Sequence, residues 1–481
     1  MTDRLRESDL ALLAQESSQT PMQNATLEIF DLGHSGFDHD ALVAHIEDRI
    51  AFVPRYRQRL LRVPGRLANP VWVDDVDFDL AYHVRRSALP RPGNLEQLLE
   101  LTARIASRSL DTDRPLWEVY LVEGLADGRL AVLSKSHEIL VDGVSTVDIG
   151  QVLLDVDPGP RRVVQEGWTP RHEPAPARLV ADALAETGRH PGTAAATARS
   201  NLAALSRGLG AVLGRAGEVA GALSNRGPRA EWPFNVDPSA QRRILCVRTS
   251  LKDHRKVRRA HGGTVNDVIL ATLAGALRSW LMARAEPVGG ARRLRALVPM
   301  SVIDEELEPT SLGSQVIARL VDLPVGESSP VVRLHQVSYA LNAHRETGKA
   351  VAADRIAGVA GFAPTTFHAL GSRLAAADDR HANLVVTNVP GPQFPMYLAG
   401  AEMVASYPVP PLHPGFSLAI GVTSYDGGVY FGISADRDAL PDVEVLGQCV
   451  TDALEELVST TGGSRARARR GTARPGTTRN S

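Results

Sequence analysis

The sequence predicts an α/β protein of the α+β kind, in which helices cover mixed sheets and a helical linker joins two such domains. Three observations lead to this prediction. The chain has 481 residues, more than one ordinary hydrophobic core holds. Strand-like and helix-like segments follow each other without strict alternation, which is typical of layered domains with mixed sheets. A stretch rich in proline and charge, residues 157–175, separates two regions of this kind.

The first domain is expected over residues 1–170, before and across the start of that stretch. In its first strand, Leu27 and Ile29 share one face and Glu28 lies between them. A later helix is expected to begin at Ser145, whose hydroxyl can cap it. The other expected elements are a strand over 24–31, helices over 38–52 and 95–108, and strands over 115–125 and 130–136 joined by the turn ADGR.

A helical linker is expected over residues 171–232, a segment rich in Ala, Leu, Gly and Arg. The pattern predicts two helices, broken near His190-Pro191-Gly192. Their apolar faces are weak and made of small residues. A linker packed against both domains fits this composition, and a surface helix that touches lipid is the alternative.

The second domain is expected over residues 233–460. Its strongest signal is residues 264–284, where apolar side chains recur at helical spacing. Residues 461–481 carry six arginines and are expected to form a disordered basic tail. The other expected elements are strands over 244–250, 294–302 and 384–392, and a hairpin of long strands over 417–436.

The composition is that of a globular protein, with 43% hydrophobic and 22% charged residues. The net charge is −2, and the few aromatic residues are not interleaved with a basic stripe, so we expect no nucleic-acid partner. Cys246 and Cys449 lie far apart and outside any Cys/His cluster. We therefore expect buried thiols, and neither a disulfide framework nor a metal site.

The N-terminal segment MTDRLRESDL is charged and lacks the apolar core of a secretory signal. No stretch of about 18 apolar residues occurs, so we expect no transmembrane helix. These features predict a cytoplasmic protein. Peripheral contact with the inner membrane or with lipid droplets stays open.

The stretch KSHEILVDG, residues 135–143, is the main candidate site. A strand delivers His137 and Glu138 to its end, beside a loop, where bases are commonly found. Asp142 either pairs with an arginine and fixes the loop or orients the histidine, and Gly143 allows a tight turn. These residues alone leave two interpretations open, a general base or a polar strand end.

Several stretches resemble the bacterial wax ester synthase/diacylglycerol acyltransferase family. The RPLWE and TVNDV stretches are the most specific, and the resemblance covers residues 8–457. The similar stretches are TPM (20–22), FDLAYHVRR (78–86), LPRPG (89–93), LDTDRPLWEVYLVEGLADGR (110–129), TVNDVILATLAGALR (264–278), VPMSV (298–302), TNVPGP (387–392) and the closing SYDGG hairpin.

The signature of that family is His-His-x-x-x-Asp-Gly, usually preceded by Lys-x. Aligned on Lys135, Asp142 and Gly143, His137 is the first histidine of this signature. Glu138 takes the place of the second histidine, which is the presumed general base. This sequence thus departs from the family at its most important position.

Two further positions also depart from the family pattern. Ile303 follows VPMSV where relatives tend to carry arginine, and Ser314 stands where asparagine is usual. Two hypotheses follow from the departures. Either Glu138 acts as the base, or the chain is a catalytically silent paralogue that binds acyl-CoA or lipid, or partners an active homologue.

The resemblance implies two chloramphenicol-acetyltransferase-like domains with the motif in a channel between them. It implies that a fatty acyl group passes from acyl-CoA, the co-substrate, to diacylglycerol or a long-chain alcohol. The base removes the hydroxyl proton, and neither a metal nor another cofactor is implied. Positioning and oxyanion stabilisation supply much of the rate. Asn266 either contributes at the channel or only starts a helix.

An ordinary glutamate titrates near 4.3 and an ordinary histidine near 6.5, so glutamate is the weaker base. Burial among Ile139, Leu140 and Val141 is expected to raise the pKa of Glu138 and so strengthen the base. Because neighbours on a strand point to opposite faces, we expect His137 to point away from Glu138.

Overall fold

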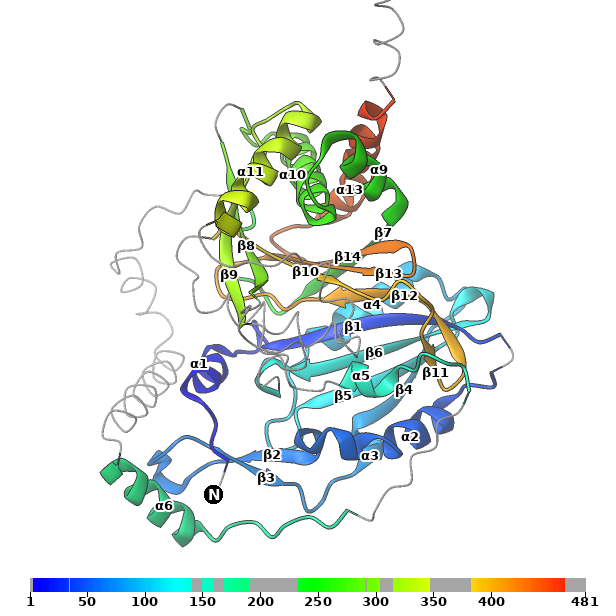
Figure 1. Ribbon diagram of the computed structural model, residues 1–481. Coiled ribbons are helices and arrows are strands. Elements are labelled where there is room, and N and C mark those ends of the chain that lie inside the picture. Colours follow the sequence, from blue (N-terminus) through cyan, green and yellow to red (C-terminus); the bar gives the residue numbers. More distant parts are fainter. Residues whose placement is uncertain are drawn as a thin grey trace, which may run out of the picture.

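The computed structural model describes residues 3–33, 35–140, 149–159, 168–189, 232–289, 292–302, 315–346 and 382–462. Two six-stranded sheets and one two-stranded sheet carry the fold, with helices packed against them (Figure 1). Both large sheets mix parallel and antiparallel pairs. The predicted fold class, mixed sheets in two chloramphenicol-acetyltransferase-like halves, is confirmed.

The first sheet has the strand order β11-β12-β1-β6-β5-β4. Only its β4–β5 pair is parallel among the pairs of described strands. The two-stranded sheet pairs β2 with β3. The bounds are β1 Gln23–Asp31, β2 Gln58–Leu61, β3 Val71–Asp74, β4 Val84–Ala88, β5 Trp117–Glu123, β6 Arg129–His137, β11 Tyr397–Leu398 and β12 Ala401–Val409.

The second sheet has the order β7-β14-β13-β10-β8-β9. Its strand β10 is parallel to both of its neighbours, β13 and β8. The bounds are β7 Arg242–Ser250, β8 Leu294–Val302, β9 Gln315–Leu323, β10 Leu384–Pro390, β13 Leu418–Tyr425 and β14 Gly428–Asp436.

The described helices cover the sheets, and α9, α10, α11 and α13 gather on the outer face of the second one (Figure 1). The α-helices are α1 Glu7–Gln15, α2 His39–Glu47, α3 Leu80–His83, α4 Leu95–Ala106, α5 Ile149–Leu153, α6 Pro176–Arg189, α9 Leu251–His261, α10 Val265–Ala283, α11 Pro330–Glu346 and α13 Val443–Thr460. The 3₁₀ helices are η1 Ile50–Phe52, η2 Pro54–Arg57, η3 Pro64–Arg66, η4 Ala126–Gly128 and η5 Glu138–Leu140.

The strands predicted from the sequence are confirmed with shifts of a few residues at their ends. The turn between β5 and β6 has left-handed backbone at Asp127 and Gly128, with φ of 62° and 65°. The helix predicted over 38–52 ends earlier, at Glu47, and η1 follows as a separate turn. The helix breaks at Arg49, whose φ of −123° lies outside the helical region. Pro54 then ends η1, because the residue before a proline disfavours helical backbone.

The first linker helix is confirmed as α6, which starts at a proline, as helices often do. The second linker helix, the start predicted at Ser145 and nearly all of the 461–481 tail lie outside the described residues. The domain boundaries at 170, 232 and 460 stay a prediction.

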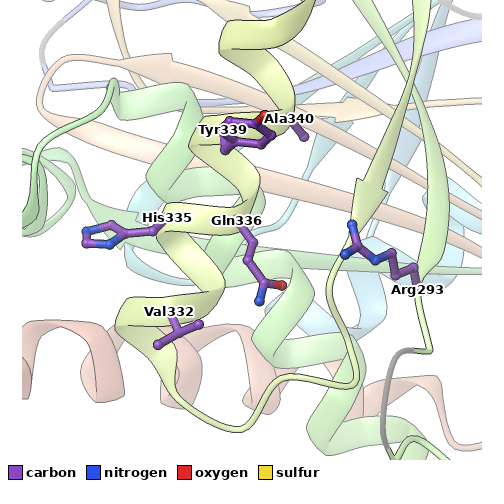
Figure 2. Close-up of a pocket in the computed structure, with 6 residues that line it drawn as sticks. All are labelled: Arg293, Val332, His335, Gln336, Tyr339 and Ala340. Carbon is purple, nitrogen blue, oxygen red and sulfur yellow. The ribbon is translucent and has the colours of Figure 1, made fainter.

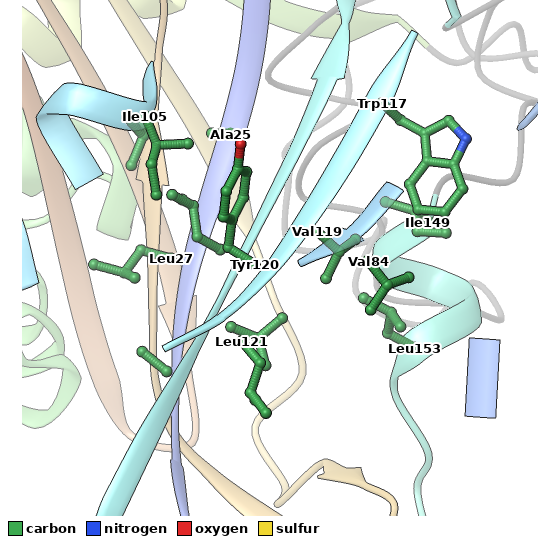
Figure 3. Close-up of a cluster of buried hydrophobic side chains, with 14 of the residues drawn as sticks. Ala25, Leu27, Val84, Ile105, Trp117, Val119, Tyr120, Leu121, Ile149 and Leu153 are labelled. Atoms are coloured by element: carbon green, nitrogen blue, oxygen red, sulfur yellow. The ribbon is translucent and has the colours of Figure 1, made fainter. Parts of the chain in front are cut away.

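Hydrophobic side chains fill both faces of the first sheet (Figure 3). Ala25, Leu27 and Tyr120 lie on the face covered by α4, which adds Ile105. Val119 lies on the opposite face, against the side of α5. Trp117 of RPLWE is fully buried, and its indole N–H donates to the carbonyl of Tyr56 at 2.7 Å, so its predicted role as a core residue is confirmed.

The C-terminal half completes the first sheet, because β12 pairs with β1 along its length. Arg242 of β7 adds a second tie by donating to the carbonyl of Gln19, next to the TPM stretch. The backbones of β14 and β12 also come very close. A Cβ built on Gly432 would lie 1.6 Å from the carbonyl oxygen of Pro408. The two sheets can meet here only because position 432 has no side chain.

We predict that Gly432→Ala destabilises the fold by roughly 3 kcal/mol, because the methyl group forces β14 and β12 apart. Gly447→Ala is the matched control. A Cβ there would meet its nearest neighbour, Val247, at 3.5 Å, an ordinary contact, and α13 gains helix propensity. Urea unfolding of both variants checks this prediction. Equal stabilities of Gly432→Ala and the parent would contradict the close approach.

Two histidines lie in the interior with few polar neighbours. His254 of α9 contacts the hydroxyl of Thr249 at 3.0 Å, and neither ring nitrogen of His413 has a hydrogen-bond partner among the described residues. Burial lowers the pKa of His254 and of His413 from 6.5 to about 4. Both rings are therefore neutral in the folded protein at neutral pH.

These pKa values predict acid destabilisation between pH 6.5 and 4. In that window the unfolded chain binds protons that the folded chain does not, so the free energy of unfolding falls as pH falls. Between pH 7 and pH 5 the free energy of unfolding should fall by about 2 kcal/mol less in His413→Leu than in the parent. Urea titrations at both values measure this, with the exposed His172→Gln as control. An unchanged loss in His413→Leu would contradict the prediction.

Candidate functional site

The His-Glu pair sits where β6 ends and η5 begins. The backbone N–H of His137 donates to the carbonyl of Leu116 at 2.9 Å, and that of Glu138 donates to the carbonyl of Met22 at 3.0 Å. Leu116 belongs to RPLWE and Met22 to TPM. Two of the motifs recognised in the sequence therefore hold the backbone of the pair, and both side chains are fully buried.

Asn24 of β1 fixes the carboxylate of Glu138. Its amide nitrogen Nδ2 donates to Oε1 of Glu138 at 3.2 Å, and both side chains are buried. Asn24 lies opposite Ser136 in the β1–β6 ladder, so its Cα position is set by the sheet. An amide donor on the carboxylate restricts the flexible glutamate stem.

His137 has different partners from Glu138. Its Nδ1 accepts from the N–H of Ile139 at 3.1 Å, and its Nε2 faces Oε2 of Glu16 at 3.4 Å. Because Nδ1 accepts, a neutral ring carries its proton on Nε2 and donates to Glu16. The expectation that His137 points away from Glu138 agrees with these contacts. Glu16, at the end of α1, was not a candidate in the sequence.

The polar face of β1 lies inside the protein. Alternation predicts that Asn24, Thr26 and Glu28 share a face, and all three are buried. Buried polar side chains of the neighbouring strands continue this face, with Thr26 opposite Ser134 in β6 and Glu28 opposite Ser406 in β12. These buried polar side chains form a row on one face of the sheet, with Glu138 near one end. Inside the protein, such groups can bind a polar ligand atom or water.

Lys135 has a structural role. Its Nζ lies 3.2 Å from Oε2 of Glu118 and donates at 2.8 Å to the carbonyl of Arg108, just beyond the end of α4. Arg85 and the hydroxyl of Tyr120 complete the surroundings of Glu118, each at 2.9 Å. Burial lowers the pKa of Lys135 and Glu118 opposes this shift, while burial raises the pKa of Tyr120. The lysine ties α4 to the strand that carries the site.

Asn266 lies near the start of α10, where Thr264 and Asp267 form the capping box. Thr264 is the N-cap, so Asn266 is not. Instead, Oδ1 of Asn266 accepts from Nδ2 of Asn388 at 2.7 Å. This bond joins the TVNDV and TNVPGP stretches. A shared channel with Glu138 stays a prediction, and the other two candidates, Asp142 and Gly143, lie outside the described residues.

The predicted channel between the halves likewise stays a prediction. A pocket of about 460 Å³ opens on the outer surface instead, between α11 and the start of β8, and none of the predicted site residues lines it (Figure 2). Its lining residues are Arg293, Val332, His335, Gln336, Tyr339 and Ala340. Within the described ranges, no group of three or more His, Cys, Asp or Glu side chains is placed to hold a metal ion.

Comparison with solved structures gives the class of fold. The first condensation domain of the CDA synthetase shares it with a TM-score of 0.53 at 15% identity, covering 95% of this chain and 96% of that one. The wax ester synthase/diacylglycerol acyltransferase of Marinobacter aquaeolei VT8 is more similar, with a TM-score of 0.64 and 26% identity over 95% of this chain and 100% of that one. Two condensation-domain-like halves thus form the architecture.

Sequence comparison then gives the family. Residues 5–269 match the wax ester synthase/diacylglycerol acyltransferase catalytic domain, and residues 312–458 match the C-terminal domain of the same family. The chain belongs to this family. A probable diacylglycerol O-acyltransferase of Mycobacterium tuberculosis is 31% identical over 471 residues, 96% of this chain and 100% of that protein. Another is 40% identical over 260 residues, 54% of this chain and 96% of that protein.

We predict that Asn24 and Glu138 act as one unit. Asn24→Leu should lower kcat for acyl transfer about tenfold and leave KM for palmitoyl-CoA nearly unchanged, because it misplaces the carboxylate without touching the donor. In Glu138→Gln the same substitution should add little, since the contact is already altered. Initial rates of the two single variants and the double variant measure this coupling.

Ser134→Ala is the control for this double-mutant cycle of Asn24 and Glu138. Ser134 is buried on the same face, and its hydroxyl has no hydrogen-bond partner among the described residues. We expect kcat within about twofold of the parent. Losses that simply add in the double variant would show that Asn24 does not act through Glu138.

Proposed function

We propose that this protein transfers a fatty acyl group from acyl-CoA to diacylglycerol or a long-chain alcohol, forming triacylglycerol or a wax ester. One observation carries the proposal. Glu138 occupies the motif position of the presumed base at the end of β6, and Asn24 holds its carboxylate at 3.2 Å. The relatives named above support the same activity, because one of them matches nearly the whole chain.

In the proposed reaction, Glu138 accepts the proton of the acceptor hydroxyl as the oxygen attacks the thioester carbonyl. The tetrahedral intermediate collapses, the carbon–sulfur bond breaks, and the proton on Glu138 passes to the departing CoA sulfur. Asn266 supplies a donor for the oxyanion from its NH₂ group, since its Oδ1 already accepts from Asn388. Acyl-CoA binds as a co-substrate, and the reaction needs no metal or resident cofactor.

The other motif residues have supporting roles in this proposal. His137 braces the strand end through Glu16 and the N–H of Ile139. Asp142 and Gly143, which lie outside the described residues, keep the supporting roles predicted from the sequence. The protein meets its lipid acceptor in the cytoplasm by peripheral contact with the inner membrane or a lipid droplet. Consistent with this, no described helix is both long and apolar enough to cross a membrane.

A second candidate function follows from the same position. The family signature has histidine where this chain has Glu138. A catalytically silent paralogue would keep the fold and bind acyl-CoA or lipid, or partner an active homologue, without transferring the acyl group. The two candidates differ in what Glu138 does, so substitutions at this position separate them.

We predict that the purified protein esterifies diolein or hexadecanol with labelled palmitoyl-CoA, and that Glu138→Ala lowers the rate by at least about 100-fold. The loss follows because alanine cannot accept the hydroxyl proton. Product formation is measured by thin-layer chromatography, and palmitoyl-CoA binding by thermal shift shows that each variant keeps its fold. Ser134→Ala again serves as control.

If the parent is inactive and the Glu138→His variant is active, the protein is a catalytically silent paralogue instead. A parent whose full activity survives in Glu138→Ala would remove Glu138 from the mechanism and leave the acyltransferase assignment to another base.

A further inference from the structure

His413 is a buried histidine that has no part in the reaction proposed above. It lies in the loop 410–417, which joins β12 to β13, and it is 2% exposed. Neither of its ring nitrogens has a hydrogen-bond partner among the described residues. Most buried polar side chains are hydrogen-bonded, so a polar ring held in the interior without a partner points to a ligand that supplies one.

One end of this loop lies beside the candidate site. Val409, the last residue of β12, is opposite Ala25 in the ladder with β1. Ala25 follows Asn24, whose amide donates to Glu138. His413 comes four residues after Val409 in the sequence. Their Cα atoms are therefore at most about 14 Å apart, which brings His413 into the neighbourhood of Glu138.

The other end of the loop is anchored on the second sheet. The N–H of Phe416 donates to the carbonyl of His413 at 3.0 Å, and Phe416 packs against Leu297 of β8 and Val385 of β10. The residues on either side of Leu297 and Val385 belong to the core under the helices. Because side chains alternate along a strand, Phe416 lies on the face of the sheet away from α9, α10, α11 and α13 (Figure 1). His413 thus lies between the end of the first sheet and this inner face of the second.

The loop also holds the histidine in a fixed place. Prolines at 410, 411 and 414 restrict its backbone, and Gly415, with a φ of 80°, allows the turn that follows His413. Apart from the half-buried Pro414, every residue of the loop is buried. Connections between strands normally run over the surface. A buried, proline-rich connection therefore positions its side chains before any ligand arrives.

The chemistry of the ring indicates what it binds. Burial lowers the pKa of His413 to about 4, so the ring is neutral at pH 7. A neutral imidazole has one N–H that donates and one nitrogen that accepts. The two acyl acceptors of the proposed reaction differ in what they offer to that N–H. Diacylglycerol carries ester carbonyl oxygens a few bonds from its hydroxyl, whereas a long-chain alcohol carries only the hydroxyl.

We propose that His413 is a substrate-binding residue that selects diacylglycerol over long-chain alcohols. Its N–H donates to an ester carbonyl of diacylglycerol, while Glu138 takes the proton of the hydroxyl. With a long-chain alcohol the same N–H stays buried and unpaired, which costs free energy in that complex. Sites built to hydrogen-bond one group of a substrate discriminate strongly against analogues that lack it. This inference rests on the proposed function and narrows its acyl acceptor.

The test compares diolein with hexadecanol as acyl acceptors of the full chain, in the same detergent and at saturating palmitoyl-CoA. We expect the parent to prefer diolein. His413→Leu should lower kcat/KM for diolein about tenfold or more, keep that for hexadecanol within about twofold and leave KM for palmitoyl-CoA unchanged. His413→Asn and His413→Gln keep an N–H donor close to the positions of Nδ1 and Nε2. At least one of them should restore part of the preference.

His254→Leu is the matched control. His254 is also buried, with its pKa lowered to about 4, but it belongs to α9 on the outer face of the second sheet. Its loss should leave the ratio of the two kcat/KM values unchanged. Urea unfolding at pH 7 separates binding from a structural role. Leucine in place of the unpartnered imidazole should keep or raise the urea midpoint in His413→Leu, whereas loss of a histidine needed for packing would lower it.

Equal losses with diolein and hexadecanol in His413→Leu, or a raised KM for palmitoyl-CoA alone, would overturn the proposal. Thermal unfolding with diolein, in the absence of palmitoyl-CoA, separates it from the proposed function. If the parent transfers no acyl group, yet diolein raises its Tm and His413→Leu loses this rise, the diacylglycerol site stands and the enzymatic proposal fails. Acyl transfer with a parent-like ratio of diolein to hexadecanol in His413→Leu would refute the role of His413 alone.

Discussion

Strand β1 holds the molecule together, because it makes a hydrogen-bonded ladder on each of its two edges. On one edge it pairs with β6, which carries the His-Glu pair, and on the other with β12 from the C-terminal half. The first ladder sets Asn24 beside Glu138. The second brings Ser406 onto the same buried face as Glu28. The geometry of the candidate site and the joining of the two halves thus depend on one strand register, and a slip of one residue would turn the side chains of β1 to the opposite face.

The buried charges near β6 help to fix this strand register. Lys135 and Glu118 are opposite each other in the β5–β6 ladder, and the lysine reaches on to the last carbonyls around α4. A buried ion pair contributes little net stability unless its remaining hydrogen bonds are satisfied. Here the carbonyls, Arg85 and Tyr120 satisfy them. The lysine of the motif therefore specifies where the strand and helix sit.

Much of the fold could be predicted from the sequence, because hydrophobic periodicity is local. The helix at 264–284, the β5–β6 pair and the closing hairpin were all predictable in this way. Pairing between distant segments was not. Asn24 and Glu138 are 114 residues apart, and β12 joins a sheet whose other main strands precede it by more than 260 residues in sequence. No local pattern encodes such a pair.

The candidate site illustrates the same limit. Alternation in β1 indicated a polar face, and the ordinary expectation for a polar face is solvent. The structure buries it, because β1 lies in the middle of the sheet and both of its faces are covered. A sequence pattern reports which side chains share a face, but what covers that face depends on the rest of the chain. Glu138 could be found from its motif, and its partner Asn24 only from the fold.

The insertion of β12 has a consequence for how the protein is made on the ribosome. Residues 401–409 reach the solution long after β1 and β6 have emerged. Until then the outer edge of β1 has no partner strand, and such edges recruit strands from other chains. The sheet of the nascent N-terminal half therefore stays incomplete for most of translation. Chaperone protection during that interval would matter more for this chain than for one whose halves close independently.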